Sequence, residues 1–205
     1  MSQSPIALAM TGASGAMYGL RLLEQLIVSQ QTVYFLASMP ALMVINMETD
    51  LNLSAHPAKM QAVLTERYQA APQQLSVFGL KQWTAPLASG SAVPRAMVVC
   101  PCTSGTLGAI AQGLSRNLIE RAAEVVLKER RQLILVHRET PLSLIHLENM
   151  LKLVRAGALL LPANPGFYHR PQKVMDVVDF VVARILDHLS ISHSLLPRWG
   201  EKKFE

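Results

Sequence analysis

The chain is poor in cysteine, with only Cys100 and Cys102 among its 205 residues. A disulfide between two cysteines so close in sequence could not cross-link distant parts of a domain. This excludes a secreted disulfide framework, and such low cysteine content is typical of proteins in a reducing compartment. The pair also lacks the spacing of a zinc site or of a thioredoxin-type redox motif. We therefore expect a cytoplasmic protein whose two cysteines belong to the core at the end of a strand.

Long apolar segments and long charged segments are absent as well. No uncharged apolar stretch approaches the roughly 18 residues that a membrane span needs. Ile6–Leu20 is apolar, but it lacks the basic segment that begins a signal peptide. Charged residues make up 16 % of the chain, and the surplus of 19 basic over 14 acidic residues is scattered. This composition excludes a disordered chain and a nucleic-acid tail, and it favours a pocket for small anions.

What the chain does have is an alternation of short apolar runs and helical patterns, without repeats or linkers. Such an alternation is typical of a parallel sheet covered by helices on both faces. We therefore predict a single α/β domain over residues 1–205, with a three-layer, Rossmann-like, doubly wound parallel sheet. The predicted strands are Ile6–Thr11, Thr32–Ala37, Ala96–Pro101, Gln132–His137 and Ala158–Leu161. The predicted helices are Gly15–Gln30, Lys59–Gln69, Ser104–Leu114, Asn117–Arg130, Pro141–Arg155 and Pro171–Leu189. Thr140 and Pro141 are expected as the N-cap and first position of their helix.

Polar or glycine-containing sequence follows each predicted strand. Ligands of such sheets bind beyond the carboxyl ends of the strands, so these segments are expected to converge on one rim. The segments are Thr11–Gly15, Ser38, Cys102–Thr106, Arg138 with Glu139, and Pro162–Arg170.

The first of these turns has the composition of a phosphate-binding turn. Gly12 and Gly15 let the backbone approach a ligand, Ser14 can cap the helix or donate its hydroxyl, and the helix start favours a phosphate. The alternative is a tight turn with nothing bound. Thr103–Thr106 has the same composition, with hydroxyl groups and a glycine between a strand and a helix. The alternative to an anion site there is plain helix capping. The second strand ends at Ser38 without the acidic residue of an NAD site, and the first turn is not Gly-x-Gly-x-x-Gly, so a mononucleotide is favoured.

Two cations are candidates for a second anion site. Arg184 lies on an otherwise apolar helix face, where its charge is costly unless an anion pairs with it. The alternative partner is Asp187, one turn further on. Lys128 ends a charged helix segment, for which the alternative is a solvated face with Glu124 as its partner. The local sequence around Glu48 indicates no function for this residue by itself.

Several short motifs occur in an order that covers nearly the whole chain. They are Thr11–Gly19, Glu48–Asp50, Ser89–Ser91, Cys100–Cys102, Arg121–Arg131, Val136–Pro141, Pro165–Pro171 and Pro197–Trp199. Together they resemble the UbiX family of flavin prenyltransferases. Two departures stand out. Met39-Pro40-Ala41 follows Ser38 where the family usually has Lys-Ala-Ala, which alters the start of the next helix, and Thr103 replaces a frequent serine.

The resemblance implies a metal-independent transferase. The family joins the dimethylallyl group of dimethylallyl monophosphate to N5 and C6 of reduced FMN. UbiD-type decarboxylases then use the prenylated FMN, including in ubiquinone biosynthesis. Family members are typically homododecamers, so some site residues are expected to reach a neighbouring subunit, and the tail from about residue 190 is expected to pack on one.

The resemblance also implies roles for individual residues. FMN is expected at Gly12, Ala13, Ser14, Ser38, Thr103, Ser104, Gly105, Thr106 and Arg138. The prenyl phosphate is expected at Ser89, Gly90, Arg121, Lys128, Tyr168 and Arg184. Among the residues expected to act in catalysis, Lys128 would stabilise phosphate charge, while Glu139, and Glu48 with Ser14, would move protons. Trp199 and Tyr168 would stabilise the allyl cation. The absence of an Asp-Asp-x-x-Asp cluster is consistent with a monophosphate donor.

Other functions remain as alternatives. A flavin-dependent decarboxylase of the cysteine-decarboxylase type has a catalytic histidine and a Pro-x-Met-Asn segment, whereas the late loop here reads Pro162-Ala-Asn-Pro-Gly-Phe-Tyr-His169. An aromatic-acid decarboxylase would release carbon dioxide without a partner protein. A passive flavin carrier needs a phosphate site but has no use for a second set of cations.

Overall fold

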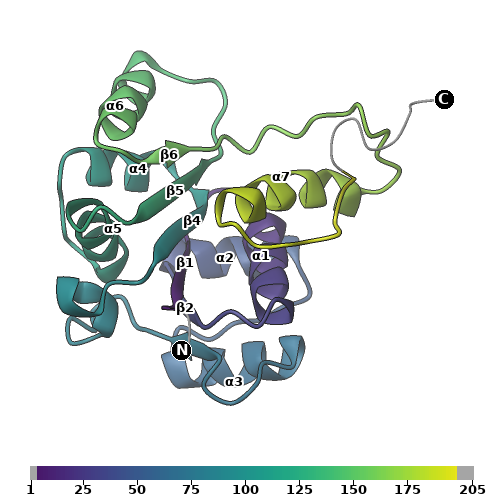
Figure 1. The fold of residues 1–205 in the computed structure, drawn as a ribbon, viewed down its shortest axis with the longest axis horizontal. Coiled ribbons are helices and arrows are strands. Elements are labelled where there is room, and N and C mark those ends of the chain that lie inside the picture. The colour runs from purple at the N-terminus through teal and green to yellow at the C-terminus, as the bar shows by residue number, and fades with distance from the viewer. Residues whose placement is uncertain (1–3, 198–205) are drawn as a thin grey trace.

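The computed structural model describes residues 4–197, in which six parallel strands form one sheet (Figure 1). The strand order is β3-β2-β1-β4-β5-β6, so β1 and β4 occupy the centre. The bounds are β1 (Ile6–Met10), β2 (Val33–Ala37), β3 (Leu75–Val77), β4 (Ala96–Cys102), β5 (Gln132–His137) and β6 (Leu159–Leu160). The chain crosses to both sides of β1, which confirms the predicted doubly wound sheet.

Helices cover both faces of the sheet and make the outer layers. They are α1 (Ala16–Val28), α2 (Met39–Glu48), α3 (Pro57–Tyr68), α4 (Ser104–Ala111), α5 (Leu118–Lys128), α6 (Leu144–Arg155) and α7 (Val174–His188). Two short 3₁₀ turns, η1 (Pro86–Ala88) and η2 (Gly90–Ala92), precede β4. Within residues 4–197, no helix is long and apolar enough to cross a membrane.

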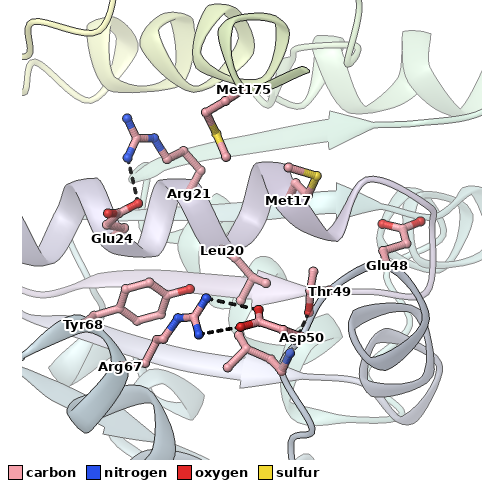
Figure 2. Close-up of a pocket in the computed structure, with 11 residues that line it drawn as sticks. Met17, Leu20, Arg21, Glu24, Glu48, Thr49, Asp50, Arg67, Tyr68 and Met175 are labelled. Atoms are coloured by element: carbon pink, nitrogen blue, oxygen red, sulfur yellow. Dashed lines mark hydrogen bonds and ion pairs between the residues drawn. The ribbon is translucent and has the colours of Figure 1, made fainter. Parts of the chain in front are cut away.

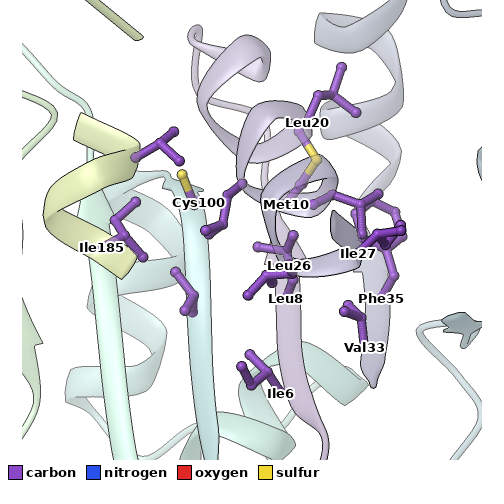
Figure 3. Packing of buried hydrophobic residues seen from close by; sticks show 14 of the residues in the cluster. Ile6, Leu8, Met10, Leu20, Leu26, Ile27, Val33, Phe35, Cys100 and Ile185 are labelled. Atoms are coloured by element: carbon purple, nitrogen blue, oxygen red, sulfur yellow. The ribbon is translucent and has the colours of Figure 1, made fainter. Parts of the chain in front are cut away.

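The core consists of two apolar clusters, one on each face of the sheet. Successive side chains of β1 alternate between them, as strand geometry requires. Leu8 belongs to one cluster with Leu26 of α1 and Ile185 of α7 (Figure 3). Ala9 belongs to the other cluster, which contains residues of α4 and α5. Every residue of β1 and β4 is buried, and the free thiols Cys100 and Cys102 belong to these clusters. The expectation that the cysteines are core residues is confirmed.

The elements that sequence patterns did not predict lie between residues 30 and 95. Helix α2 is apolar on several sides, including the exposed Met39, Met43 and Met47, so its sequence has no helical period. Strand β3 has only three residues, of which Leu75 pairs with Val33 of β2. Most other predicted boundaries differ from the structure by only a few residues.

One predicted helix start is wrong. Helix α6 begins at Leu144, and its N-cap is Ser143 rather than Thr140. Ser143 Oγ accepts a hydrogen bond from the His146 backbone N–H at 3.3 Å, and His146 Nδ1 accepts from the Ser143 N–H at 3.2 Å. This reciprocal capping box satisfies two donors at the helix start, which Pro141 upstream does not do.

After α7 the chain packs against its own domain. Ile191 is buried in the core, and Leu195 packs against the same cluster. His193 Nε2 lies 3.2 Å from Asp187 Oδ1 of α7. Residues 190–197 therefore cover α7 of the same chain. Packing of the tail on a neighbouring subunit stays a prediction, and Trp199 lies outside the described residues.

The approach of α1 to β4 depends on Gly19, because a Cβ atom there would collide with the Cys100 carbonyl oxygen and the Met10 side chain. We expect Gly19→Ala to destabilise the protein by about 1–3 kcal/mol through overpacking. Gly108→Ala is the matched control, since a Cβ at that position in α4 first meets Asn149 at an ordinary 3.4 Å. Thermal unfolding at one protein concentration measures both, and equal midpoints for the two variants would contradict the packing argument.

Candidate active site

The turns after β1, β2, β4 and β5 meet at one edge of the sheet, here called the carboxyl rim. The buried Thr11 hydroxyl donates to the Pro101 carbonyl oxygen at 2.9 Å and accepts from the Thr103 N–H at 2.8 Å. The Ser38 N–H donates to the last carbonyl of β1, and the Arg138 N–H donates to the last carbonyl of β4. The predicted convergence of these strand ends is therefore confirmed.

The start of α1 already holds a carboxylate. Glu48, the last residue of α2, accepts hydrogen bonds from the Gly15 N–H at 2.9 Å and from the Ala16 N–H at 2.8 Å. Gly15 has a φ of 104°, a left-handed conformation that favours glycine. The N–H groups that were predicted to favour a phosphate are therefore occupied by Glu48, and that part of the prediction is wrong. The same bonds place Glu48 beside Ser14, the residue with which it was expected to act.

Gly12 has a packing role in the same turn. A Cβ atom at this position would collide with the ring of Pro40 in the first turn of α2. Ser38 is the N-cap of α2, and its Oγ accepts from the Ala41 N–H at 3.1 Å. The departure at Met39-Pro40 therefore places a proline directly over the glycine turn. Gly12 therefore permits the close approach of this helix, and its contact with a ligand stays a prediction.

The start of α4 is open by comparison. Thr103 caps the helix, because its Oγ1 accepts from the Thr106 N–H at 3.1 Å. A Cβ atom at the exposed Gly105 would meet nothing within 4 Å. Backbone N–H groups of a first helical turn lack partners within their own helix and attract anions. Of the two predicted turns, this one fits the phosphate of a mononucleotide.

A hydrogen-bonded group lies beside the start of α4. Ser104 Oγ donates to Glu139 Oε2 at 3.0 Å and lies 3.0 Å from Nε2 of the buried His137. The Thr140 N–H also donates to Glu139, at 3.1 Å. These bonds, that from Ser104 first, hold the pKa of Glu139 below its ordinary value. Burial lowers the pKa of His137, so near neutral pH Glu139 is anionic and His137 is neutral.

Arg138 connects two of the turns, because its Nε donates to the Ser14 carbonyl oxygen at 3.0 Å. Tyr18, in the first turns of α1, is half-buried, and burial raises its pKa. Sequence reasoning assigned no role to Thr11, Tyr18 or His137. A signal for His137 was present, since a polar residue that ends the apolar run 133–136 needs a partner when it is buried.

Lys128 lies at the opposite edge of the sheet, and Arg121 lies about two helical turns before it in α5. Lys128 ends α5, and only a short turn separates it from the first residue of β5. The seven residues of β4 span about 20 Å between the two edges. Lys128 pairs with Glu129, whereas Glu124, considered as the alternative partner of Lys128, pairs with Arg121 at 3.0 Å. Within one chain, Lys128 therefore lies away from the predicted FMN residues of the carboxyl rim, and the expectation that some site residues reach a neighbouring subunit stays a prediction.

Ser89 and Gly90 lie against these cations. A Cβ atom at Gly90 would collide with the Glu129 carboxylate and lie 3.1 Å from Lys128 Nζ. Arg121 Nε donates to the carbonyl oxygen of Ala88, the residue before Ser89, at 3.1 Å. The structure therefore brings four predicted phosphate-binding residues together, away from the carboxyl rim. We call them the amino-edge cluster: Ser89, Gly90, Arg121 and Lys128.

Arg184 lines a separate cavity of about 460 Å³ against α7. Its Nη1 lies 2.7 Å from Asp187 Oδ2, which confirms the intrahelical salt bridge considered as an alternative. Tyr168 borders the same cavity, with its ring edge-on to Phe180 at 5.7 Å between centroids. The cavity is lined by Tyr168, Phe180, Ala183, Arg184, Asp187, His193, Leu196 and Pro197.

A further pocket of about 410 Å³ lies among α1, α2, α3 and α7, with Glu48 at one end (Figure 2). Arg67 forms two hydrogen bonds with the Asp50 carboxylate, at 2.8 and 3.1 Å. Arg21 pairs with Glu24. Both arginines that line this pocket are therefore paired within the chain. Among residues 4–197, no group of three or more histidine, cysteine or acidic side chains is arranged to hold a metal.

Comparisons with known proteins agree on one family. The model of the flavoprotein family matches residues 1–186. The flavin prenyltransferase UbiX of Pseudomonas aeruginosa is 61% identical over 197 residues, which cover 96% of this chain and 94% of that protein. The flavin prenyltransferase UbiX of Halalkalibacterium halodurans is 46% identical over 193 residues, which cover 94% and 92%.

Solved structures give the same result. AnUbiX (PadA1) in complex with FMN and dimethylallyl pyrophosphate is 39% identical with a TM-score of 0.86, covering 98% of this chain and 100% of that one. A dodecameric FMN-dependent UbiX-like decarboxylase from Escherichia coli O157:H7 is 39% identical with a TM-score of 0.84, covering 95% and 98%. A PPC decarboxylase, 16% identical with a TM-score of 0.57 over 83% and 86%, shares the fold alone. The chain therefore belongs to the flavoprotein family and, within it, to the UbiX flavin prenyltransferases.

Proposed function

We propose that this chain transfers the dimethylallyl group of a dimethylallyl phosphate to N5 and C6 of reduced FMN. The observation that carries the proposal is the carboxyl rim, where an open helix start lies beside an anionic carboxylate. The first feature suits the phosphate of a mononucleotide, and the second suits proton transfer. The names of the similar UbiX proteins, and the FMN and dimethylallyl pyrophosphate bound to AnUbiX, support the same activity.

The residues of the rim fit FMN. The turn at the start of α4 would receive its phosphate, with the turn after β1 and the residues Ser38 and Arg138 nearby. When bound, reduced FMN supplies the nucleophilic nitrogen and carbon. The residues that would hold it are Gly12, Ala13, Ser14, Ser38, Thr103, Ser104, Gly105, Thr106 and Arg138.

The transfer breaks an allylic C–O bond, and the phosphate leaves with the electron pair. Bond formation at N5 releases one proton. Ring closure at C6 releases a second proton but also requires a proton on the remaining prenyl double bond, so one proton is released overall and the site needs groups that both accept and return protons. Glu139 is suited to accept a proton because hydrogen bonds hold its pKa low and keep it anionic. Glu48, bonded at the start of α1 beside Ser14, is the second acceptor. The aromatic face of Tyr168 would stabilise the allyl cation, and Trp199 is proposed to do the same.

Cations that stabilise the leaving phosphate would come from more than one subunit. Lys128 of the amino-edge cluster lies about 20 Å, the length of β4, from the rim of its own chain, so a second copy would bring this cluster to the rim. Exposed apolar residues of α6 support an assembly, because Leu144, Ile145 and Val154 are more than half exposed. A similar protein of E. coli is dodecameric, and we propose the same homododecamer here.

The product would be used by a UbiD-type decarboxylase, in ubiquinone biosynthesis or in the decarboxylation of aromatic acids, and the protein would act in the cytoplasm. A cysteine-decarboxylase activity is disfavoured by the late loop 162–169, and the PPC decarboxylase shares the fold alone. A passive flavin carrier would not need Arg184 beside an aromatic cavity.

Anaerobic incubation with reduced FMN and dimethylallyl monophosphate tests the reaction directly. Mass spectrometry of the released flavin is expected to show the addition of one C₅H₈ unit. Oxidised FMN is expected to stay unchanged, because its N5 is not nucleophilic. A parallel incubation with dimethylallyl diphosphate determines which donor is used. An unchanged flavin mass with both donors, under conditions where both ligands bind, would contradict the proposed function.

Removal of Arg184 separates the transferase from a flavin carrier. We expect Arg184→Ala to slow prenyl transfer by about 100-fold or more, because a preorganised cation on the leaving phosphate is lost. FMN affinity should change by less than about twofold, since this cavity is separate from the rim. Lys59→Ala, at an exposed position of α3, is the control and should affect neither. Equal losses of FMN binding and transfer in Arg184→Ala would indicate a simple cofactor site.

Mixing of inactive variants tests whether the site is shared between subunits. Lys128→Ala and Glu139→Gln alter opposite edges of the chain, so co-assembled oligomers are expected to regain about a quarter of the wild-type activity. Ser14→Ala mixed with Glu139→Gln is the control, because both changes affect the rim of the same chain and no intact rim can form. Recovery equal in the two mixtures, or absent from both, would overturn the shared site.

A further inference from the structure

The end of β5 carries a buried histidine that the proposed function does not use. The His137 side chain is 3% exposed, and its ring lies edge-on to that of His146, with 6.2 Å between centroids. Its Nε2 is 3.0 Å from Ser104 Oγ. A buried imidazole is costly unless it is hydrogen-bonded, so the bond to Ser104 is the interaction that compensates for its burial.

The direction of the bonds follows from the number of protons available. Glu139 is anionic and can only accept, so the single Ser104 hydroxyl proton is donated to Glu139 Oε2 at 3.0 Å. Ser104 Oγ is then left with lone pairs, and the His137 Nε2 atom that faces it must carry a proton. A neutral imidazole has only one N–H, so His137 has its proton on Nε2.

Ser104 has no competing role at the start of its helix. The N-cap of α4 is Thr103, whose Oγ1 accepts from the Thr106 N–H. Ser104 follows it, and its hydroxyl points to His137 and Glu139 instead. This hydroxyl is therefore engaged within the protein before any ligand arrives, and only the Ser104 backbone N–H remains for a phosphate.

We propose that His137 is a positioning residue, which orients the Ser104 hydroxyl so that it donates to Glu139 and holds that carboxylate as an anion on the carboxyl rim. The inference rests on the proposed function in one respect, because Glu139 is taken as a proton acceptor in prenyl transfer. It assigns to Ser104 a role toward Glu139 in place of a side-chain contact with FMN.

Charged and titratable neighbours face this group from two elements. Arg138 follows β5, and α6 contributes His146; both positive charges, when present, disfavour protonation of His137. The Glu139 carboxylate acts in the opposite direction, but burial is the largest effect and keeps the pKa of His137 below its ordinary value. Arg138 and His146 also favour the anionic form of Glu139. From α4, the neighbour is the uncharged Ser104. The surroundings therefore support a neutral imidazole beside an ionised carboxylate.

Substitution of His137 tests the orientation. His137→Leu removes the donor, whereas His137→Gln retains an amide N–H at a similar distance along the side chain. Without an oriented Ser104, the pKa of Glu139 rises, so the acid limb of the pH–rate profile should move upward by roughly one unit in His137→Leu. On that limb the rate should fall about tenfold, with FMN affinity changed by less than about twofold. His137→Gln should retain the wild-type profile.

Ser104→Ala provides an independent variant in case His137→Leu does not fold. It should produce the same shift of the acid limb, and the double variant with His137→Leu should show no further shift, because both act through one hydrogen bond. A wild-type profile in Ser104→Ala, or additive shifts in the double variant, would overturn the proposal.

A measurement without flavin or turnover completes the test. Solid-state NMR of ¹⁵N-histidine-labelled, sedimented protein reports the tautomer of each ring, and the signal missing in His137→Gln identifies His137. We expect the Nε2–H form at neutral pH. An Nδ1–H form or an imidazolium would refute the orientation. Failure of the wild type to prenylate FMN would instead refute the proposed function and leave the tautomer result unaffected.

Discussion

Burial of parallel strands on both faces is the constraint on which the site depends. Strands β1 and β4 have no exposed residue, so the polar groups of this region are confined to the strand ends. There the Thr11 hydroxyl bonds to both the carbonyl of Pro101 and the N–H of Thr103. The two central strands therefore end in register, and the turns that follow them are held at a fixed separation.

The electrostatics of a single chain are incomplete for the proposed reaction. The carboxyl rim contains Glu48 and Glu139, with Arg138 close by, and two carboxylates are a poor environment for a departing phosphate. The amino-edge cluster contains Lys128 and Arg121, each paired with a carboxylate of α5 or its C-cap, Glu129 and Glu124 respectively. In the proposed assembly these cations would have to exchange those partners for the leaving phosphate.

Much of this arrangement could be predicted from local sequence. Apolar runs indicated the strands, and the polar residues after them indicated the rim. Contacts between distant residues could not be predicted, because nothing in the sequence near Gly15 shows that Glu48, 33 positions away, caps its helix. The place of Lys128 was predictable, since a helix that directly precedes a parallel strand must end at the amino edge. The family motifs indicate the role of each residue, but they do not indicate which subunit of an oligomer contributes that residue to a given site.

The packing of Pro40 on Gly12 has a consequence for how the site meets its ligand. Pro40 fixes the first turn of α2 to the loop after β1, and Glu48 at the other end of the same helix returns to the start of α1. The loop after β1, helix α2 and the Glu48 carboxylate are thus joined in a closed ring of contacts around Ser14. These contacts restrict backbone motion in the ligand-free protein, so little conformational entropy remains to be lost when a ligand binds.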